Sequence, residues 1–280
     1  MESFMSIYVC SDIHGLYDLY EAMLAATGLT GDDRLYILGD MVDRGPDGIR
    51  ILQDAASRPN VTCLIGNHEH MMWNYLNRKT IFEGRIWLHP ANGGRETLAR
   101  YKKLSPDDSA RVKKFISELY LQVEIEAEGT TFLFSHSSFL ADRGTVRWCD
   151  CSVSKKEVSD VVWNSPWRQF EYADPEYYRA DGRYHVIGHV PVPRLDGGNW
   201  SQKTRPKMPK FYHDPVHRIV NIDLGCAMIP TIRANRDKYG EAFAREAALC
   251  VLDLGKFARG EKEPAIYIGI DGKDTSGPLG

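Results

Sequence analysis

The stretch LYILGDMVDRGP (residues 35–46) joins an apolar run to a cluster of charged side chains. Its first four residues are apolar or aromatic and of the kind that strands favour. Asp40, Asp43 and Arg44 then follow within five positions, with a glycine on either side of them. Charged side chains that come directly after a buried strand indicate a functional loop at the edge of a sheet.

The same arrangement occurs three times near the start of the chain. Each of three apolar runs precedes a segment with helical periodicity: 6–10 before 16–27, 33–39 before 47–57, and 61–66 before 69–79. This β-α-β-α-β-α order predicts an α/β fold in which three parallel strands are joined by right-handed crossovers.

The rest of the chain changes character after two further helical stretches, at about 93–104 and 106–120. Mostly strands are expected from there on, at 131–135, 184–188, 218–225, 248–255 and 265–270. We expect a mainly antiparallel second layer whose last two strands form a hairpin. Residues 191–217 predict a long loop, and a helix is expected from about 236. The prediction is a single domain over 1–270 with a disordered tail at 271–280.

Composition excludes several classes of protein. The 280 residues are 43% hydrophobic, which is enough for a sizeable core, and the net charge of −3 provides no basic field for nucleic acid. Neither a signal peptide nor a membrane span is indicated, so we expect a cytoplasmic protein without a membrane partner. Cys10, Cys63, Cys226 and Cys250 lie in apolar runs and should be reduced and buried.

Two further cysteines leave an alternative open. Cys149 and Cys151, in RWCDCS, resemble half of a zinc site, but the second pair of ligands is missing. A loop with two free thiols is therefore the preferred interpretation.

Polar side chains follow each of the three predicted parallel strands. Asp12, Asp40 and Asn67 are separated by 28 and 27 residues, one strand-helix unit each, so they should meet at the carboxyl edge of the sheet. Such a group of carboxylates and an amide is costly unless positive charge lies among them. His136 and His189 end two later strands in the same way. Oxygen and nitrogen donors without thiolate predict two divalent ions, with manganese preferred and iron, zinc or magnesium compatible.

Each motif has a simpler interpretation when taken alone. SDIHG and the segment from Asn67 could form turns with helix N-caps, and GDMVDRGPDG could lead into a helix with Pro46 in its first turn. A single histidine at a strand end is more often satisfied or exposed than a metal ligand. Recurrence at five strand ends favours the metal site, because turns need no such choice of residues.

The motifs SDIHG, GDMVDRG, GNHE, SHSS and GHVPV resemble the phosphoprotein phosphatase family of calcineurin-like metallophosphoesterases, in particular its bacterial and phage-type serine/threonine phosphatases. The resemblance implies a metallophosphoesterase four-layer sandwich, with two mixed β-sheets flanked by helices. It also implies that Asp12 and His14 hold a first metal, that Asp40 bridges both metals, and that Asn67, His136 and His189 complete the second site.

A mechanism follows for this arrangement. Two cations would lower the pKa of a bridging water towards about 7 and so supply a hydroxide that attacks phosphorus. His68 would protonate the leaving oxygen, Asp43 would orient His68, and the planar fork of Arg44 would bind two phosphate oxygens. The second phosphate-binding arginine of the family has no direct counterpart, and Arg168 is the nearest substitute.

We therefore expect a metal-dependent phosphomonoesterase, a serine/threonine protein phosphatase that acts on phosphorylated proteins or peptides. One alternative is a symmetrical dinucleoside tetraphosphate hydrolase on the same scaffold. GHVPV, which is close to the GHTP of phosphatases, favours the first interpretation. A non-catalytic binding scaffold is a second alternative, which would predict the loss of at least one metal ligand.

Overall fold

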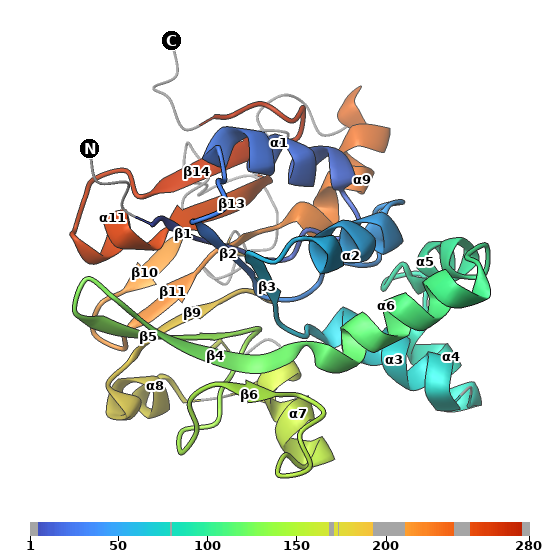
Figure 1. Cartoon of the computed structure of the whole chain (residues 1–280), viewed down its shortest axis with the longest axis horizontal. Helices are drawn as coiled ribbons and strands as arrows, with labels where there is room; N and C mark the ends of the chain where they lie inside the picture. The colour runs from blue at the N-terminus through green and yellow to red at the C-terminus, as the bar shows by residue number, and fades with distance from the viewer. Residues whose placement is uncertain are drawn as a thin grey trace.

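The computed structural model describes residues 5–78, 80–167, 171–172, 174–192, 211–237 and 247–275. Two six-stranded mixed sheets pack face to face, and helices cover their outer faces (Figure 1). This is the α/β four-layer metallophosphoesterase architecture that the sequence predicts.

The first sheet has the order β12-β13-β1-β2-β3, and β14 also pairs with β13. Its strands are β1 (Ile7–Cys10), β2 (Arg34–Ile37), β3 (Val61–Cys63), β12 (Asp223–Leu224), β13 (Ala248–Asp253) and β14 (Ala265–Gly269). The pairs β1-β2 and β2-β3 are parallel, as predicted, whereas β13 is antiparallel to each of its neighbours.

The second sheet has the order β10-β11-β9-β5-β4-β6. Its strands are β4 (Tyr120–Ala127), β5 (Thr130–Ser135), β6 (Val146–Arg147), β9 (Tyr184–Ile187), β10 (Tyr212–Asp214) and β11 (Ile219–Asn221). Its centre is parallel, at β5-β9 and β9-β11, and its margins are antiparallel. Two short strands, β7 (Asn164–Ser165) and β8 (Glu171–Tyr172), pair apart from both sheets.

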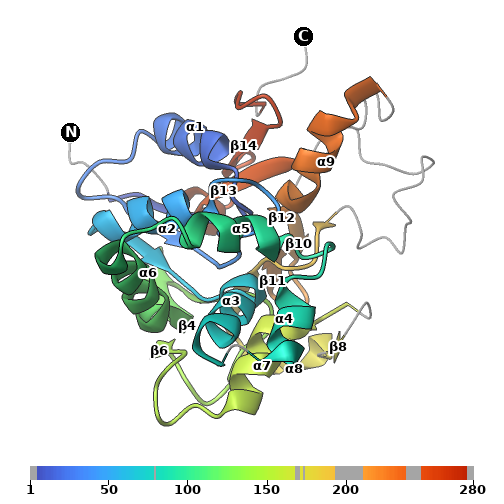
Figure 2. The ribbon, with the colours of Figure 1, turned by 90° about the vertical axis from the view of Figure 1, so that its right-hand side faces the viewer.

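The described helices lie mostly on the first sheet and beside it (Figures 1 and 2). They are α1 (Tyr17–Thr27), α2 (Gly48–Ser57), α3 (Asn67–Arg78), α4 (Ile81–Trp87), α5 (Gly94–Tyr101), α6 (Pro106–Glu118), α7 (Lys155–Trp163), α8 (Pro175–Asp181), α9 (Ile229–Ala234), α11 (Leu254–Ala258) and a 3-10 turn, η2 (Cys226–Met228). None of them is long and apolar enough to cross a bilayer.

Alternation along the strands builds the layers of the core. In β13, Cys250 and Leu252 point into the space between the two sheets, whereas Leu249 and Val251 point toward the helices on the other face. This period of two lets every central strand contribute to two hydrophobic layers at once. On the outer face of the second sheet, Tyr178 of α8 closes a smaller third cluster.

Several predictions for the second half of the chain were wrong. The last strands do not form a separate layer: β12, β13 and β14 extend the first sheet, because β13 pairs directly with β1. β13 and β14 are antiparallel neighbours, as expected, but the segment of chain that connects them contains α11. The strand β4 and the helices α4, α7 and α8 were not anticipated.

The loop and tail predictions are only partly covered by the described residues. β10 lies inside the segment 191–217 that we interpreted as a loop, and 193–210 lie outside the described residues. The helix expected from about 236 falls mainly on 238–246, which are also outside them. In the predicted tail, residues 271–275 fold back on β14 through an Ile268–Asp274 bridge, and 276–280 are not described.

The cysteines agree with expectation. All six are free, the four in apolar runs are buried, and Cys149 and Cys151 are exposed.

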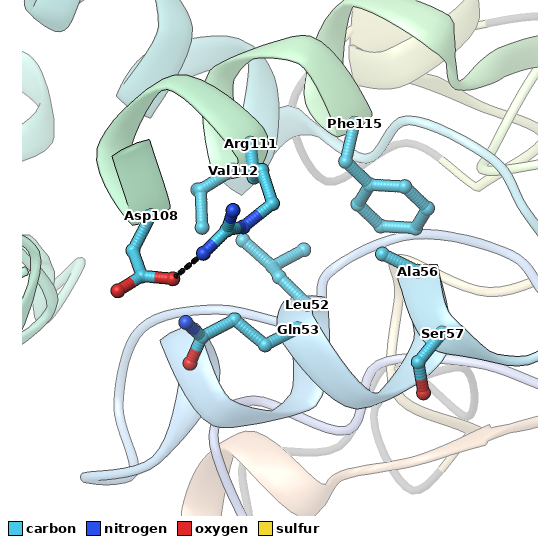
Figure 3. Close-up of a pocket in the computed structure, with 8 residues that line it drawn as sticks. All are labelled: Leu52, Gln53, Ala56, Ser57, Asp108, Arg111, Val112 and Phe115. Carbon is cyan, nitrogen blue, oxygen red and sulfur yellow. Dashed lines mark hydrogen bonds and ion pairs between the residues drawn. The ribbon is translucent and has the colours of Figure 1, made fainter. Parts of the chain in front are cut away.

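A pocket of about 350 Å³ lies where α2 and α6 diverge (Figure 3). Leu52, Val112 and Phe115 form its apolar wall, and the ion pair between Asp108 and Arg111 forms part of its rim. None of the residues that line this pocket belongs to the predicted site.

Candidate functional site

The carboxyl ends of β1, β2 and β3 are in register, so their three loops begin at one edge of the sheet. Cys10 lies opposite Ile37, and Ile37 lies opposite Cys63. Hydrogen bonds between these strands continue one residue beyond the ends of β2 and β3. Leu38 N donates to Cys10 O at 2.9 Å, and Leu64 N donates to Ile37 O at 2.8 Å. The polar residues that follow therefore start from neighbouring positions, as the spacing of the motifs predicts.

The first two loops are bonded to each other through their backbones. His14 N donates to Asp40 O and Gly15 N to Met41 O, both at 2.9 Å, while Gly45 N donates back to His14 O at 2.8 Å. Gly15 has a left-handed φ of 68°, and a Cβ there would lie 2.5 Å from Gly45 O. A side chain does not fit at this crossing, so the glycine is required where the two loops touch.

Left-handed backbone is concentrated in these loops. Within the described residues, eight non-glycine residues have positive φ, and six of them are predicted site residues: Asp12, His14, Asp40, Asp43, Arg44 and His189. This conformation is uncommon for residues with a Cβ and costs of order 1–3 kcal/mol at each position. The surrounding hydrogen bonds must hold the loops against this strain.

Two groups of potential metal ligands share Asp40. The first contains His14, Asp40 and His68, and the second contains Asp40, His136 and His189; within each group the ligand atoms lie within 4.8 Å of one another. A carboxylate common to both groups suits a ligand that bridges two cations.

Backbone carbonyls orient two of the imidazoles. His14 Nδ1 lies 3.2 Å from Val42 O, and His136 Nδ1 lies 2.8 Å from Leu38 O. The Nε2 atoms then face Asp40, at 3.7 Å for His14 and 3.6 Å for His136. An imidazole that donates from one nitrogen to a carbonyl is fixed in the tautomer whose other nitrogen can bind a metal.

Asn67 lies between His136 and His189. Its Oδ1 is 3.0 Å from His136 Nε2 and 3.1 Å from His189 Nδ1. Because Asn67 is the first residue of α3, its side chain extends from the start of the helix into the cluster.

Asp12 presents one oxygen to the protein and keeps the other for a ligand. Its Oδ2 accepts from His189 N at 3.0 Å and from Ser11 Oγ. Among the described residues, Asp12 Oδ1 and His189 Nε2 are buried without a hydrogen-bond partner. Such buried orphan atoms are costly, and a bound cation would satisfy both.

Burial shifts the pKa values of the ionisable side chains in the cluster. It raises the pKa of Asp12 and Asp40 well above the usual range, with repulsion between the carboxylates adding to the effect. It also lowers the pKa of His14 and His136, and it lowers the pKa of His189 to about 4. Without a bound cation, neither charged carboxylates nor charged imidazoles are stable in this buried cluster. The oxygen and nitrogen donors, together with the orphan atoms, fit divalent cations such as Mn²⁺, Fe²⁺, Zn²⁺ or Mg²⁺.

A hydrogen-bonded dyad lies beside the cluster. His68 Nδ1 is 2.7 Å from Asp43 Oδ2, and Trp87 Nε1 donates to the same oxygen at 2.8 Å. Burial raises the pKa of Asp43 to about 7, against the lowering effects of Thr97 and Trp87. Burial, and then the positive charge of Arg44, lower the pKa of His68. His68 Nε2 is 3.9 Å from Asp40 Oδ2, so its free nitrogen faces the metal ligands.

Of the two arginines that we predict to bind phosphate, the structure describes Arg44 but not Arg168. Arg44 is half-buried, and its backbone lies where Gly93 comes so close that a Cβ there would be 2.5 Å from Arg44 N. Its charge contributes to the lowered pKa of His14 and His68, which places the guanidinium in the field of the site. Arg168 lies outside the described residues, so its predicted role stays a prediction.

Glu69 was given no role from the sequence, but it connects the second and third loops. Its carboxylate accepts from Asp40 N at 2.8 Å, Met41 N at 2.8 Å, Val42 N at 3.1 Å and Gly66 N at 3.0 Å. Burial raises its pKa to about 7, although these N–H groups lower it. A charged residue in the first turn of α3, directly after two site residues, was the available signal.

Trp87 was missed as well. It comes from α4, which the sequence analysis did not anticipate, and no local pattern connects it with Asp43.

Known proteins resemble this chain in sequence or in fold. Asymmetrical bis(5'-nucleosyl)-tetraphosphatase PrpE of Bacillus subtilis is 27% identical over 79% of this chain and 86% of its own length. A symmetrical bis(5'-nucleosyl)-tetraphosphatase of Acidovorax is 40% identical over 23% of this chain and 24% of its own length. A serine/threonine phosphatase structure from Saccharomyces cerevisiae has a TM-score of 0.54 at 13% identity, covering 95% of this chain and 79% of that one.

The yeast likeness shows a shared fold alone. Residues 5–193 match the family described as calcineurin-like phosphoesterase, a span that contains all the predicted ligands and the His68–Asp43 dyad. This family uses a binuclear centre of divalent metal ions. The chain belongs to the calcineurin-like phosphoesterase family.

Proposed function

We propose that this chain hydrolyses phosphate esters at a binuclear metal site, by direct transfer of the phosphoryl group to water. The observation that carries the proposal is the convergence at one place of six donors from five strand ends, five of them buried and His189 partly buried, with Asp40 shared by both ligand groups. In our proposal Asp12 and His14 hold one cation, Asn67, His136 and His189 hold the other, and Asp40 contacts both. No predicted ligand is missing, which speaks against a non-catalytic scaffold.

When bound, the cations supply the positive charge that lowers the pKa of a water molecule and neutralises phosphate oxygens. The buried cluster keeps bulk water out, and Arg44 binds two phosphate oxygens through its planar fork.

His68 is proposed as the general acid. Asp43 accepts a hydrogen bond from His68 Nδ1–H, so the proton for the leaving oxygen is held at Nε2 and points toward the metal ligands. The Trp87 N–H on the same carboxylate fixes the orientation of Asp43. A cation beside the ring would oppose a second positive charge, so the hydrogen bond to Asp43 is what maintains a protonated imidazole. Such acid catalysis contributes about 10² to 10⁴ in rate.

The first candidate substrate is a phosphoserine or phosphothreonine of a protein. The motif GHVPV supports it. Manganese is the proposed native metal, because the donors are mixed oxygen and nitrogen.

The second candidate is a dinucleoside tetraphosphate. The relative that aligns over most of this chain is named as an asymmetrical bis(5'-nucleosyl)-tetraphosphatase, which supports this candidate at least as well. Both reactions would use the same cations and the same arginine, and they differ in the leaving group and in what lies beyond the phosphate.

The experiment compares both substrates in one assay. Protein purified without chelator and loaded with Mn²⁺ is given a phosphoserine peptide, diadenosine tetraphosphate and para-nitrophenyl phosphate, and kcat/KM is measured for each. The substrate class is identified by whether kcat/KM is larger for the phosphoserine peptide or for diadenosine tetraphosphate. Asp40→Asn should abolish all three activities and weaken Mn²⁺ binding in calorimetry, since the shared ligand loses its charge. Near-normal turnover in that variant would refute the assignment.

A further inference from the structure

The helix α4 exposes apolar side chains on its outer face. Ile81 is 78% exposed, Phe82 is 68% exposed and Ile86 is 36% exposed. Among the described residues, half of the large hydrophobic side chains that are exposed lie on this one helix of seven residues. Short helices of soluble proteins normally turn such residues inward, and a contiguous exposed apolar patch indicates a binding surface.

The inner face of the same helix contacts the catalytic dyad. Trp87 is fully buried, and its Nε1 donates to Asp43 Oδ2 at 2.8 Å. At Gly84 the helix faces α3, because a Cβ there would make an ordinary van der Waals contact of 3.4 Å with the ring of Tyr75. In Figure 1 the helix forms the right-hand margin of the molecule, and in Figure 2 it faces the viewer beside α3. The exposed patch and the proposed general acid are therefore carried by adjoining elements.

Basic residues outnumber acidic ones around the patch, because residues 78–96 contain Arg78, Lys79, Arg85 and Arg95 against Glu83 and Glu96. Arg85 is on α4 itself, Arg78 ends the preceding helix, and Arg95 donates from Nε to Leu88 O at 3.0 Å, just beyond the end of α4. All three arginine side chains are exposed, although the chain as a whole has a net charge of −3. We call Ile81, Phe82 and Ile86, together with these three arginines, the α4 surface. Its complement is a partner that is both acidic and apolar.

We propose that the α4 surface binds an acidic polypeptide segment with apolar side chains, next to the phosphorylated residue of a protein substrate. This inference rests on the first candidate of the proposed function and extends it to substrate recognition. Seven helical residues span about 10 Å, the length of about three residues of extended chain.

Two other occupants fit the surface less well. A nucleobase would stack on Phe82 or on an arginine but would leave the aliphatic Ile81 and Ile86 uncovered, whereas apolar peptide side chains would cover all three apolar groups. A second copy of this chain would bring two surfaces with the same excess of basic residues together, and the like net charges would repel.

The test uses the double variant Ile81→Ser/Phe82→Ser, with Val216→Ser as the matched control. Val216 is 62% exposed and lies in the turn between β10 and β11, so its replacement also removes an exposed apolar side chain. The probe is a phosphoserine peptide flanked by leucine and glutamate, and a second peptide has serine in place of leucine. Kinetics are measured with Mn²⁺-loaded protein, and affinity is measured by fluorescence anisotropy with a non-hydrolysable phosphonate form of each peptide.

For the leucine peptide we expect the double variant to raise KM and the dissociation constant about five- to tenfold, as removal of a central apolar anchor does. Val216→Ser should change neither. The serine peptide should bind the wild type and the double variant equally, and kcat/KM for para-nitrophenyl phosphate should stay within about twofold. Arg85→Glu, which keeps the apolar groups, should weaken binding of the leucine peptide as well.

The outcomes separate the two proposals. The wild type could hydrolyse no phosphate ester while the double variant still binds the leucine phosphonate peptide more weakly than the wild type does. In that case the proposed function fails and the binding surface stands. If both peptides bind the double variant as tightly as the wild type, the inference is overturned. It is also overturned if sedimentation shows a wild-type dimer that the double variant splits while peptide affinity is unchanged, because the surface then joins two copies.

Discussion

Replacing Glu69 by glutamine tests whether one buried carboxylate holds the loops of the site together. Oε1 accepts from Met41 N and Val42 N, and Oε2 accepts from Asp40 N and Gly66 N. Glutamine has one oxygen, so its NH₂ group would face two of the four N–H donors.

The magnitude follows from counting the donors that lose their acceptor. Two unsatisfied buried N–H groups cost about 1–3 kcal/mol each, or about 2–6 kcal/mol together. Removal of a buried charge offsets part of this cost, so we expect Glu69→Gln to lower the free energy of unfolding by about 2–4 kcal/mol. With a urea slope of about 2 kcal/mol/M, the midpoint should fall by about 1–2 M.

The assay is urea unfolding of metal-free protein at pH 8, followed by circular dichroism. Glu118→Gln is the control, because Glu118 is exposed and its carboxylate makes a surface ion pair with Lys114 at 3.8 Å. It should change the free energy of unfolding by less than about 0.5 kcal/mol. If Glu69→Gln behaves like this control, the four hydrogen bonds do not stabilise the loops and the reasoning fails.

Three further changes test other parts of the site and fold. His68→Asn should leave Mn²⁺ binding intact and reduce kcat by about 10²-fold or more for alkyl phosphates but less for activated aryl phosphates; equal losses would exclude an acid role. Gly66→Ala should lower both stability and metal affinity, because its Cβ would lie 2.5 Å from Asp40 N, and calorimetry with unchanged Mn²⁺ affinity would contradict this. Asp181→Asn should lower the free energy of unfolding by about 2 kcal/mol at pH 7. Burial raises the pKa of Asp181, but the neighbouring His185 and Arg183 outweigh it and hold the pKa well below its usual range. The wild-type advantage is therefore present above about pH 4 and lost as the pH falls further, and a constant difference down to pH 2.5 would refute it.

Local sequence patterns were sufficient for the first three strand-helix units of the fold. The three strand-helix units were predicted because each apolar run and each helix has its own periodicity, and the parallel order then follows from chain connectivity. Asp12, Asp40 and Asn67 meet for the same reason: each follows the end of a strand that is in register with its neighbour.

Long-range pairing could not be obtained in this way. Nothing in the composition of β13 shows that it pairs with β1, more than 200 positions earlier, so the last strands were assigned to the wrong layer. Trp87 was missed because its contact with Asp43 depends on how α4 packs, and Glu69 because its four partners lie in the two neighbouring loops.

The left-handed residues show most clearly what the sequence does not contain. A strand-forming run followed by aspartate predicts a turn, but not that Asp12, His14 and Asp40 adopt a positive φ, which is uncommon for any residue with a Cβ. Strain at three or more positions, at about 1–3 kcal/mol each, is a large part of the stability of an ordinary domain. It persists because the loops are over-determined: His14 N is bonded to Asp40 O, Asp40 N to Glu69, and His189 N to Asp12. Each loop is thus held by the next one rather than by its own sequence. We therefore expect the loss of one connecting hydrogen bond to displace metal ligands on more than one loop, because each bond joins two of them.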